Sequence, residues 1–495
     1  MKKTAWCLVA ALGCAALHAD LEKGFKAPPA AAKPHTRFHM MNGNVTKEGL
    51  TRDFEELARA GVGGVQMFDA GCAIPAGGLD FNSPAWFEMF RHAASEARRL
   101  GLEICIPNCS GWSSSGGPWN PPSNGMKRVT FRQVTATGPA KFEAKLPREM
   151  DDHGFYADIG VFAFPTPPAE KATFPGVTTK VEPDGFTMTG TQPFEAAGFS
   201  FRLDYGWAWS ADAEIALEIS EDGTTFRPFE KFRFPLARSG SRDTSLRFHA
   251  FPKKTTMRAL RAKIVQSGVK ATLKEAHPER RARLSNLAAK TFAVRQEVAC
   301  DTAPTTPDQV VAKGAVRDLT ANLRADGTLA WDVPAGDWTI LRVGYLCNGH
   351  CNHPASDHGR GLEVDKLSAE ALDYHFEQYV ARLCRTLGPL AGNVATGFNN
   401  ILVDSFEVGS QNWTQKMEAE FQKRRGYSLR PFMPAFAGYI LEDVPTTERF
   451  LEDFRRVVSD LFAENYAGAL TKKCHAYGLK CSIEPYGNCP ADNLQ

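Results

Sequence analysis

The 495-residue chain lacks the sequence features of a membrane protein, of a nucleic-acid-binding protein and of several enzyme classes. Beyond residue 20, no segment reaches the roughly 18 consecutive apolar residues that indicate a membrane-spanning helix. Lys and Arg number 58 against 56 Asp and Glu, so no basic field attracts the phosphates of a nucleic acid. No Gly-rich phosphate loop, Gly-x-Ser-x-Gly elbow or His-Glu-x-x-His pattern occurs, which leaves nucleotide binding, serine esterase and zinc-protease chemistry without support.

What is present is the composition of a folded soluble protein. The chain is 43% hydrophobic and 23% charged, and its length predicts two to four domains. An aromatic content of 11% suits a carbohydrate-handling protein and an ordinary hydrophobic core equally well. Composition alone therefore does not name a ligand.

The N-terminus resembles a secretory signal peptide. Lys2 and Lys3 form a positive region, residues 5–17 are an apolar run too short to span a bilayer, and a small residue, Ala19, closes the segment. We therefore expect residues 1–19 to be removed and the protein to be exported to the periplasm or the extracellular space. A lipoprotein attached at Cys14 is the weaker alternative, because alanine stands where the lipobox motif has leucine.

Strand-like and helix-like segments alternate in two stretches of the chain, 20–118 and 361–495, which we interpret as the two parts of one βα domain. The predicted strands are 38–41, 64–68, 102–106, 362–365, 400–404 and 479–484. The predicted helices are one capped by Thr46 and ended by Gly61, one opened by Ser83 with Pro84 and ended by Gly101, and those at 369–387, 414–425 and 448–477.

Residues 119–360, between these two stretches, have a different pattern. Short strand-like pieces follow one another with turn residues between them, and Asp222-Gly223 is a strong hairpin signal. Segments 331–333 and 338–343 continue the pattern after a second Asp-Gly pair. We predict one or two β-sandwich modules inserted into the βα domain.

The βα stretches together supply about six strands, whereas a closed (β/α)8 barrel needs eight. Either the chain forms a different, open α/β sheet, or it ends before its barrel closes. We favour the second interpretation: a (β/α)8-type barrel that is incomplete at the C-terminus and interrupted by inserted β-sandwich modules.

Polar side chains follow the predicted strands, at the ends where (β/α)8 barrels carry their active sites. They are Asn42 and Asn44 after the first strand, Asp69 after the second, Asn108 and Trp112 after the third, Glu363 and Asp365 after the insertion, Asp404 and Glu407 after Ile401-Leu402-Val403, and Glu484 in the last strand. Amides can bind sugar hydroxyls and tryptophan can stack on a sugar ring, although the same residue types also make turns and fill cores.

Glu407 and Glu484 are the catalytic candidates. Glycosidic cleavage uses two carboxyl groups, one a protonated acid at the leaving oxygen and the other a base or nucleophile. From position alone, a glutamate after a strand can equally well cap a helix or form an ion pair. Asp404 directly follows a buried strand, which also allows a structural or metal-binding role.

Several motifs, occurring in one order, resemble glycoside hydrolase family 106, the bacterial α-L-rhamnosidases. They are residues 41–49, 61–69, 107–112, 116–119, 333–342, 352–354 and 361–368, then Asp404-Ser405-Phe406-Glu407 and Glu484-Pro485-Tyr486-Gly487. Together they cover most of residues 36–490 outside the predicted sandwich, so the resemblance is specific.

The resemblance implies an inverting exo-glycosidase that removes terminal α-L-rhamnose from plant cell-wall polysaccharides such as rhamnogalacturonan. Glu407 best matches the acid position, and Glu484 is the second catalytic candidate. The resemblance also implies a calcium ion near the sugar, for which we expect Glu363 and Asp365 as ligands. The expected substrate-binding residues are Asn42, Asn44, Asp69, Asn108, Trp112, His353, Asp404 and Tyr486.

Three alternatives stay open. Members of the family are much longer than this chain, so the partner glutamate can lie beyond Gln495 and the polypeptide can be an inactive fragment. A sugar-binding protein without catalysis would use the sandwich and a half-barrel cleft. A glycosidase of different sugar specificity would use the same barrel.

Overall fold

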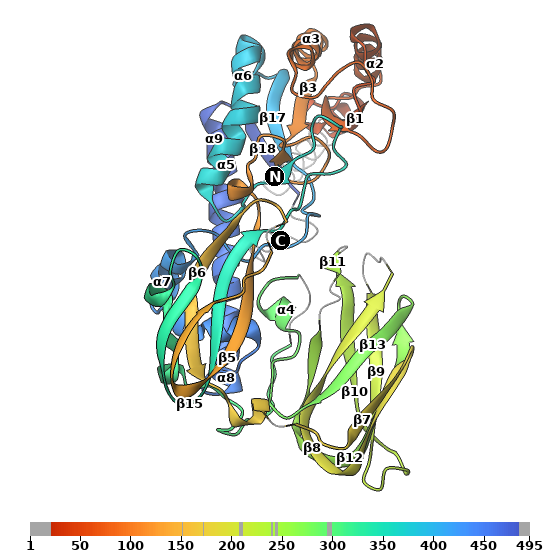
Figure 1. Cartoon of the computed structure of the whole chain (residues 1–495). Helices are drawn as coiled ribbons and strands as arrows, with labels where there is room; N and C mark the ends of the chain where they lie inside the picture. The colour runs from red at the N-terminus through yellow and green to blue at the C-terminus, as the bar shows by residue number, and fades with distance from the viewer. Residues whose placement is uncertain are drawn as a thin grey trace, which may run out of the picture.

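The structure, a computed structural model, describes residues 21–484 apart from 151, 172, 207–210, 239–240, 243–245 and 295–298. The expected signal peptide, residues 1–19, lies outside the described residues, and so does Tyr486. Three sheets dominate the described part: a parallel sheet with its helices, a four-stranded antiparallel sheet and a seven-stranded sheet (Figure 1). Among the helices of this part, none has the length and apolar character required to cross a membrane.

The parallel sheet combines strands from both ends of the chain. Its order is β1 (His35–Met41), β2 (Gly64–Ala70), β3 (Glu103–Pro107), β17 (Gly397–Val403) and β18 (Lys480–Ile483), and each neighbouring pair is parallel. Residues 400–404 and 479–484 therefore lie beside the first three strands although the whole antiparallel region separates them in sequence. The (β/α)8-type barrel, incomplete at the C-terminus, stays a prediction.

One predicted strand of this sheet is wrong. Residues 362–365 contain only the two-residue strand β16 (Leu362–Glu363), which pairs antiparallel with β4 (Gly116–Gly117) outside the parallel sheet. The alternation of apolar and polar residues at 362–365 therefore belongs to this short pairing with the loop that follows β3, and not to a strand of the parallel sheet. Five parallel strands, rather than six, are thus formed by the described residues.

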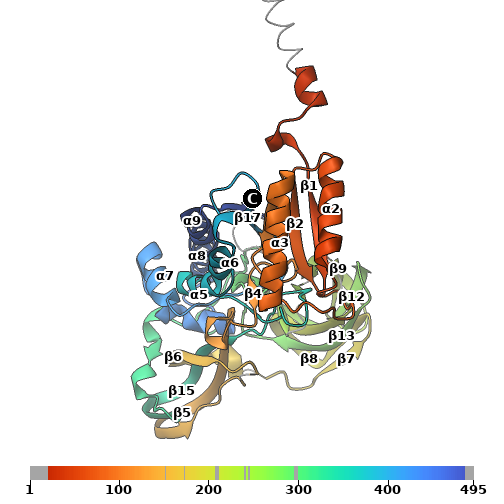
Figure 2. The same ribbon diagram turned by 90° about the horizontal axis from the view of Figure 1, so that it is seen from above.

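The first two helices begin and end where their capping residues predict. In α2 (Lys47–Arg59), Thr46 Oγ1 accepts a hydrogen bond from the Gly49 N–H at 3.1 Å. In α3 (Pro84–Leu100), Ser83 Oγ accepts one from the Trp86 N–H at 3.2 Å, and Gly101 ends the helix with φ +74°. Both helices lie along the same face of the sheet (Figure 2).

The later helices are interrupted by single π-helical turns. The predicted helix 369–387 is α5 (Ala369–Phe376), η6 (Glu377–Ala381) and α6 (Arg382–Leu387). The predicted helix 448–477 is α8 (Val444–Phe462), η9 (Ala463–Gly468) and α9 (Ala469–Ala476); it begins four residues early because Asp443 Oδ1 caps the Thr446 N–H at 2.7 Å. Between them lies α7 (Met417–Arg425), three residues shorter than predicted.

The region 119–360 is dominated by antiparallel pairing. One sheet has the order β14 (Arg317–Asp318), β6 (Tyr156–Pro165), β15 (Thr328–Cys347) and β5 (Lys127–Lys145). The other has the order β11 (Ser241–Arg242), β10 (Arg227–Arg238), β9 (Ala211–Ser220), β12 (Arg247–Ser267), β8 (Gly185–Tyr205) and β13 (Ala271–Glu279), with β7 (Val177–Glu182) on β8. The predicted hairpin at Asp222-Gly223 is confirmed, since it joins β9 to β10. Segments 331–333 and 338–343 belong to one strand, β15, with a bulge between them.

Short helices complete the chain. They are α4 (Leu287–Lys290), η1 (Ala30–Ala32), η2 (Pro122–Asn124), η3 (Pro168–Lys171), η4 (Lys313–Ala315), η5 (Thr320–Asn322), η7 (Gly388–Leu390) and η8 (Arg430–Ala437).

The cores show which sheets belong together. One large apolar cluster joins the helical face of the parallel sheet to the four-stranded sheet, where Phe162 and Val343 pack with the helices. The seven-stranded sheet has an apolar cluster of its own, which includes Phe199 and Ile215. The four-stranded sheet is therefore built onto the βα domain, whereas the seven-stranded sheet is packed around a separate core.

Candidate active site

The two faces of the parallel sheet have different surroundings. Along β1, Phe38 and Met40 pack into the large apolar cluster, whereas Arg37 and His39 lie on the opposite face. There the Arg37 guanidinium lies 5.2 Å from the centre of the Phe68 ring. The polar face leads to the carboxyl ends of the strands, where the candidate site lies.

Three carboxylates meet at this carboxyl edge, and we call Asp404, Glu407 and Glu484 the carboxylate cluster. The Glu484 N–H donates to the Val403 carbonyl at 2.9 Å, which continues the pairing of β17 with β18 and sets Glu484 beside Asp404. Burial raises the pKa of Glu484, and the negative charge of Asp404 raises it further. Burial also raises the pKa of Glu407, where the nearby His353 acts in the opposite direction and Asp404 in the same one.

The innermost member of the cluster, Asp404, is held by the polypeptide. Its Oδ2 lies 3.4 Å from Arg37 Nη2, and its Oδ1 accepts a hydrogen bond from the Ser405 N–H at 2.8 Å. Asp404 is 3% exposed, whereas Glu407 is half-buried and Glu484 is exposed. The two glutamates identified as catalytic candidates are thus the accessible members of the cluster.

A cluster of aromatic side chains, Trp112, His39 and Phe68, lies beside this edge. The half-buried Trp112 ring packs edge-on against His39 at 5.8 Å and Phe68 at 6.5 Å between ring centres. The Trp112 N–H donates to the His353 carbonyl at 3.2 Å. The backbones of Trp112 and His353 are therefore in contact, and an indole in this position can pack against the apolar face of a sugar, although contact of either residue with substrate stays a prediction.

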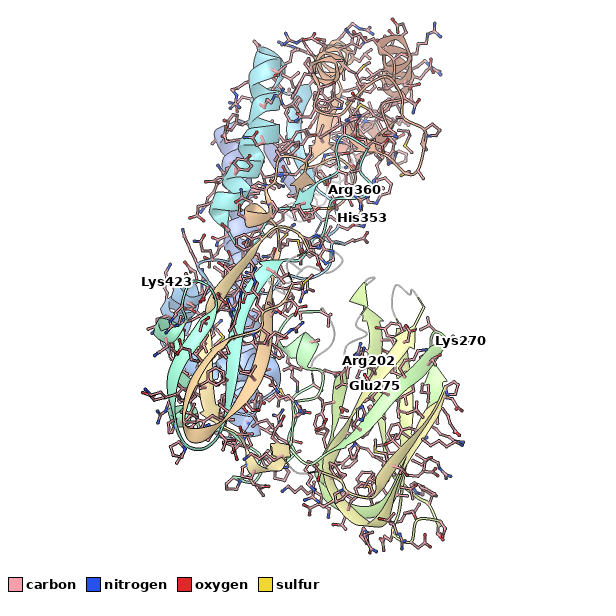
Figure 3. All side chains as sticks on the ribbon, in the orientation of Figure 1. Arg202, Lys270, Glu275, His353, Arg360 and Lys423 are labelled. Atoms are coloured by element: carbon pink, nitrogen blue, oxygen red, sulfur yellow. The ribbon has the colours of Figure 1, made fainter. Side chains whose placement is uncertain are left out.

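His353 lies on the loop between β15 and β16. Figure 3 shows His353 and Arg360 next to each other at the end of the βα domain that faces the antiparallel sheets. The backbone of His353 is fixed by hydrogen bonds with Ser113, whereas its imidazole is exposed. Because the charge of His353 acts on Glu407, the exposed imidazole of His353 lies near the carboxylate cluster.

The predicted amide ligands hold loops. Asn42 Nδ2 donates to the Ile74 carbonyl at 2.8 Å, and its Oδ1 accepts from the Asp357 N–H at 3.2 Å. Asn44 donates to two carbonyls, including that of Pro75 at 2.8 Å. The fully buried Asn108 donates to Ser115 Oγ at 2.7 Å. A direct contact of these three amides with substrate stays a prediction.

Asp69 at the end of β2 is almost completely buried. Its Oδ1 accepts a hydrogen bond from Ser110 Oγ at 2.8 Å. Burial raises its pKa to about 6, against the effect of its hydroxyl donors. Asp69 therefore keeps its proton to a higher pH than an exposed aspartic acid does.

The two expected calcium ligands do not fit a calcium ion. Both Glu363 and Asp365 are buried and already paired with ammonium groups, Glu363 with Lys366 at 2.7 Å and Asp365 with Lys127 at 3.1 Å. Glu363 also accepts from Ser113 Oγ at 2.8 Å. Although burial opposes its charge, Lys366 and these donors lower the pKa of Glu363. Over the described ranges, no group of three or more His, Cys, Asp and Glu is arranged to hold a metal ion.

Two basic residues of the site escaped the sequence analysis. Arg37 lies outside the predicted strand 38–41, because β1 begins three residues earlier, at His35. Lys366 stands three residues after Glu363, but the two residues lie in a strand and the turn that follows it, where this spacing does not by itself predict an ion pair.

A parallel sheet whose carboxyl edge gathers acidic, aromatic and basic side chains is an arrangement that carbohydrate-active enzymes use. The chain belongs to the α-L-rhamnosidase family, glycoside hydrolase family 106, whose family model matches residues 26–495.

Two relatives show the extent of this similarity. A solved structure of a rhamnosidase from Novosphingobium sp. PP1Y superposes with a TM-score of 0.79 at 28% identity, over 94% of this chain and 47% of that one. A curated protein of Formosa agariphila, named a putative beta-glucuronidase, is 34% identical over 96% of this chain and 31% of its own length. The chain thus spans about a third to a half of the length of these relatives.

Proposed function

We propose that this chain carries catalytic groups of a glycoside hydrolase that releases terminal α-L-rhamnose from rhamnogalacturonan-like plant polysaccharides. The observation that carries the proposal is the carboxylate cluster, in which Glu407 and Glu484 are accessible and have raised pKa values. Family membership and the similarity to a solved rhamnosidase support rhamnose as the sugar that is released.

In the proposed reaction Glu407 is the general acid. It gives its proton to the glycosidic oxygen as the bond from that oxygen to the anomeric carbon breaks, and the raised pKa of Glu407 favours the protonated form that this step needs. Glu484 accepts a proton from a water molecule, whose oxygen forms the new bond to the anomeric carbon from the opposite side. This single displacement inverts the configuration of the sugar.

The test is release of rhamnose from an aryl α-L-rhamnoside by the 495-residue chain and its Glu407→Gln variant. We expect a loss of about 10²- to 10⁴-fold in kcat, the usual contribution of a general acid. Glu56→Gln, on the exposed face of α2, is the matched control and should keep full activity. An active wild-type chain whose rate Glu407→Gln leaves unchanged would contradict the assignment of Glu407.

The anomer that is released first tests the role of Glu484. NMR of the early product should show the β-anomer of rhamnose, because inversion of an α-linkage yields it. Early release of the α-anomer would instead indicate a double displacement, and Glu484 would not act as a base on water.

A second sugar specificity has one observation in its favour, the name of the Formosa agariphila relative. An aryl β-glucuronide in the same assay separates the two. Faster cleavage of the glucuronide would identify glucuronic acid, and not rhamnose, as the sugar that the enzyme recognises. Binding of rhamnose oligosaccharides without cleavage of either glycoside would favour a sugar-binding role.

Export belongs to the same proposal, because an enzyme acting on cell-wall polysaccharides must meet them outside the cytoplasm. Mass spectrometry of the protein recovered from its host should find a new N-terminus close to residue 20. An intact Met1 would contradict export by a cleaved signal peptide.

A further inference from the structure

The last helix and the last strand of the described chain bring two cysteines together. Cys474 lies in the last turn of α9, and its carbonyl accepts hydrogen bonds from the Tyr477 N–H at 3.0 Å and the Leu479 N–H at 2.8 Å. Between these two residues Gly478, with φ +71°, turns the chain back into β18. Cys481 in β18 therefore returns to the end of the helix that carries Cys474.

The alternation of side chains after this turn determines which face Cys481 occupies. Leu479 and Cys481 pack into the large apolar cluster that also contains Cys474. The side chain between them, Lys480, does not join this cluster, and its Nζ pairs with Glu103 Oε2 of β3 at 2.7 Å. The two thiols therefore meet between α9 and β18, where the Cys474 thiol donates a hydrogen bond to Cys481 Sγ.

The two thiols differ in access and in reactivity. Cys474 is completely buried, whereas Cys481 is half-buried and is the one that an oxidant can reach. The hydrogen bond from Cys474 lowers the pKa of the Cys481 thiol, burial opposes this effect, and the Thr471 hydroxyl reinforces it. The same hydrogen bond and burial raise the pKa of Cys474. Because the thiolate is the attacking species in disulfide exchange, Cys481 is the nucleophile of the pair and Cys474 the resolving thiol.

We propose that Cys474 and Cys481 are a site of oxidative modification, which a disulfide-bearing oxidant converts to an intramolecular disulfide that fastens β18 to α9. The Cys481 thiolate attacks one sulfur of the oxidant, so that a mixed disulfide forms and the S–S bond of the oxidant breaks. Cys474 then gives up its proton and attacks Cys481 Sγ, which breaks the mixed disulfide. Two electrons pass from the pair to the oxidant, whose two sulfurs leave as thiols with the two cysteine protons.

This bond would act on the strand that leads to Glu484. Among the described strands, β18 pairs with β17 alone, over the four residues Lys480–Ile483. Cys481 stands three residues before Glu484, so a disulfide at Cys481 limits the movement of this glutamate relative to α9. The redox state of the surroundings would thus set how firmly one member of the carboxylate cluster is held.

Mass spectrometry of the 495-residue chain tests the proposal, with oxidised glutathione as the oxidant and alkylation to block the thiols that remain. Trypsin cuts after each lysine, so Cys474 and Cys481 fall on separate peptides, 474–480 and 481–495. We expect these two peptides as one disulfide-linked product, at least about tenfold more abundant than any product that links Cys474 to another cysteine. Reduction before digestion should separate them.

Four variants assign the bond. Cys481→Ser should lose the linked product, whereas Cys489→Ser should keep it although Cys489 lies on the same peptide. Cys384→Ser, which removes the thiol of α6 that acts on Cys474, should also keep it. Cys474→Ala should stop at the mixed disulfide and carry one glutathione on Cys481. Oxidation should also raise the thermal unfolding midpoint of the wild type by a few degrees more than that of Cys481→Ser.

Three outcomes would overturn the proposal. The first is that oxidised glutathione yields no product linking peptides 474–480 and 481–495, and the second is that this product persists in Cys481→Ser. The third is a bond from Cys474 to Cys384, which would leave β18 unfastened. An equal rise of the unfolding midpoint in the wild type and Cys481→Ser would contradict the fastening of β18 to α9. Both readouts are independent of glycosidase activity and of export, so failure of the proposed function does not affect them.

Discussion

Charged side chains are buried in the loops at the carboxyl edge of the parallel sheet, whereas they are exposed in the seven-stranded sheet. At the carboxyl edge, the Lys366–Glu363 pair is completely buried. In the seven-stranded sheet, buried apolar residues alternate with charged ones along β9, and pairs such as Arg202–Glu275 stay in water, with side chains 48% and 35% exposed. Burying an ion pair costs desolvation free energy, and an apolar pair can often replace it without destabilising the fold. The buried Lys366–Glu363 pair therefore indicates that these two side chains are needed to hold the loops in a particular geometry.

The largest effect is expected from breaking the buried pair. Lys366→Met leaves the Glu363 carboxylate buried without its cation, which should lower the free energy of unfolding by about 3–5 kcal/mol. Lys423→Met on the exposed face of α7 is the control, within about 0.5 kcal/mol of the wild type (Figure 3). Urea unfolding of the βα domain is the measurement.

The double variant Glu363→Gln/Lys366→Met sharpens this test. Removing both charges should recover part of the loss, because no unpaired ion then stays buried. Equal stability of Lys366→Met and Lys423→Met would show that the buried pair does not stabilise the fold. The carboxyl edge and the seven-stranded sheet would then not differ in the energetic effect of their ion pairs.

The next effect concerns Asp69 and depends on pH. Its pKa is about 6 in the folded chain against 3.8 in the unfolded one, so the folded state binds the proton more tightly. Stability contributed by this group is therefore lost as pH rises from about 4 to about 6, by an amount of about 3 kcal/mol when fully ionised. Asp69→Asn should gain stability relative to the wild type over this interval. Asp53→Asn, on the exposed face of α2, is the control and should show no such trend. A difference between Asp69→Asn and wild type that is equal at pH 4 and pH 7 would contradict the assignment.

Local signals and distant partners explain how much of this architecture could be predicted. The caps at Thr46 and Ser83 are confirmed because the hydrogen-bond partner of each lies three residues away in sequence. Residues 362–365 misled the strand prediction because the partner that fixes them, Gly116–Gly117, is remote. The carboxylate cluster followed from the rule that strand ends meet at one edge. The Lys127–Asp365 pair, which spans 238 residues, carried no signal that a single sequence can show.

A smaller effect is expected at the N-terminal cap of α3, which the sequence alone was sufficient to predict. Ser83→Ala removes the acceptor for the Trp86 N–H and should cost about 1 kcal/mol. Ser95→Ala, exposed in the middle of α3, is the matched control and should be neutral or slightly stabilising, because alanine has the higher helix propensity. If both variants changed the unfolding midpoint equally, the cap would contribute nothing.

The smallest effect is expected on the seven-stranded sheet, where Arg202 and Glu275 face each other across β8 and β13 at 2.7 Å (Figure 3). Water screens this pair, and ordering two long side chains offsets the attraction, so a double-mutant cycle with Arg202→Met and Glu275→Gln should give a coupling of about 0.2–1 kcal/mol. The value should fall further in 1 M salt, which shortens the screening length to about 3 Å. A coupling as large as that of Lys366 with Glu363 would mean that burial does not separate the two regions, and the geometric interpretation of the carboxyl edge would lose its basis.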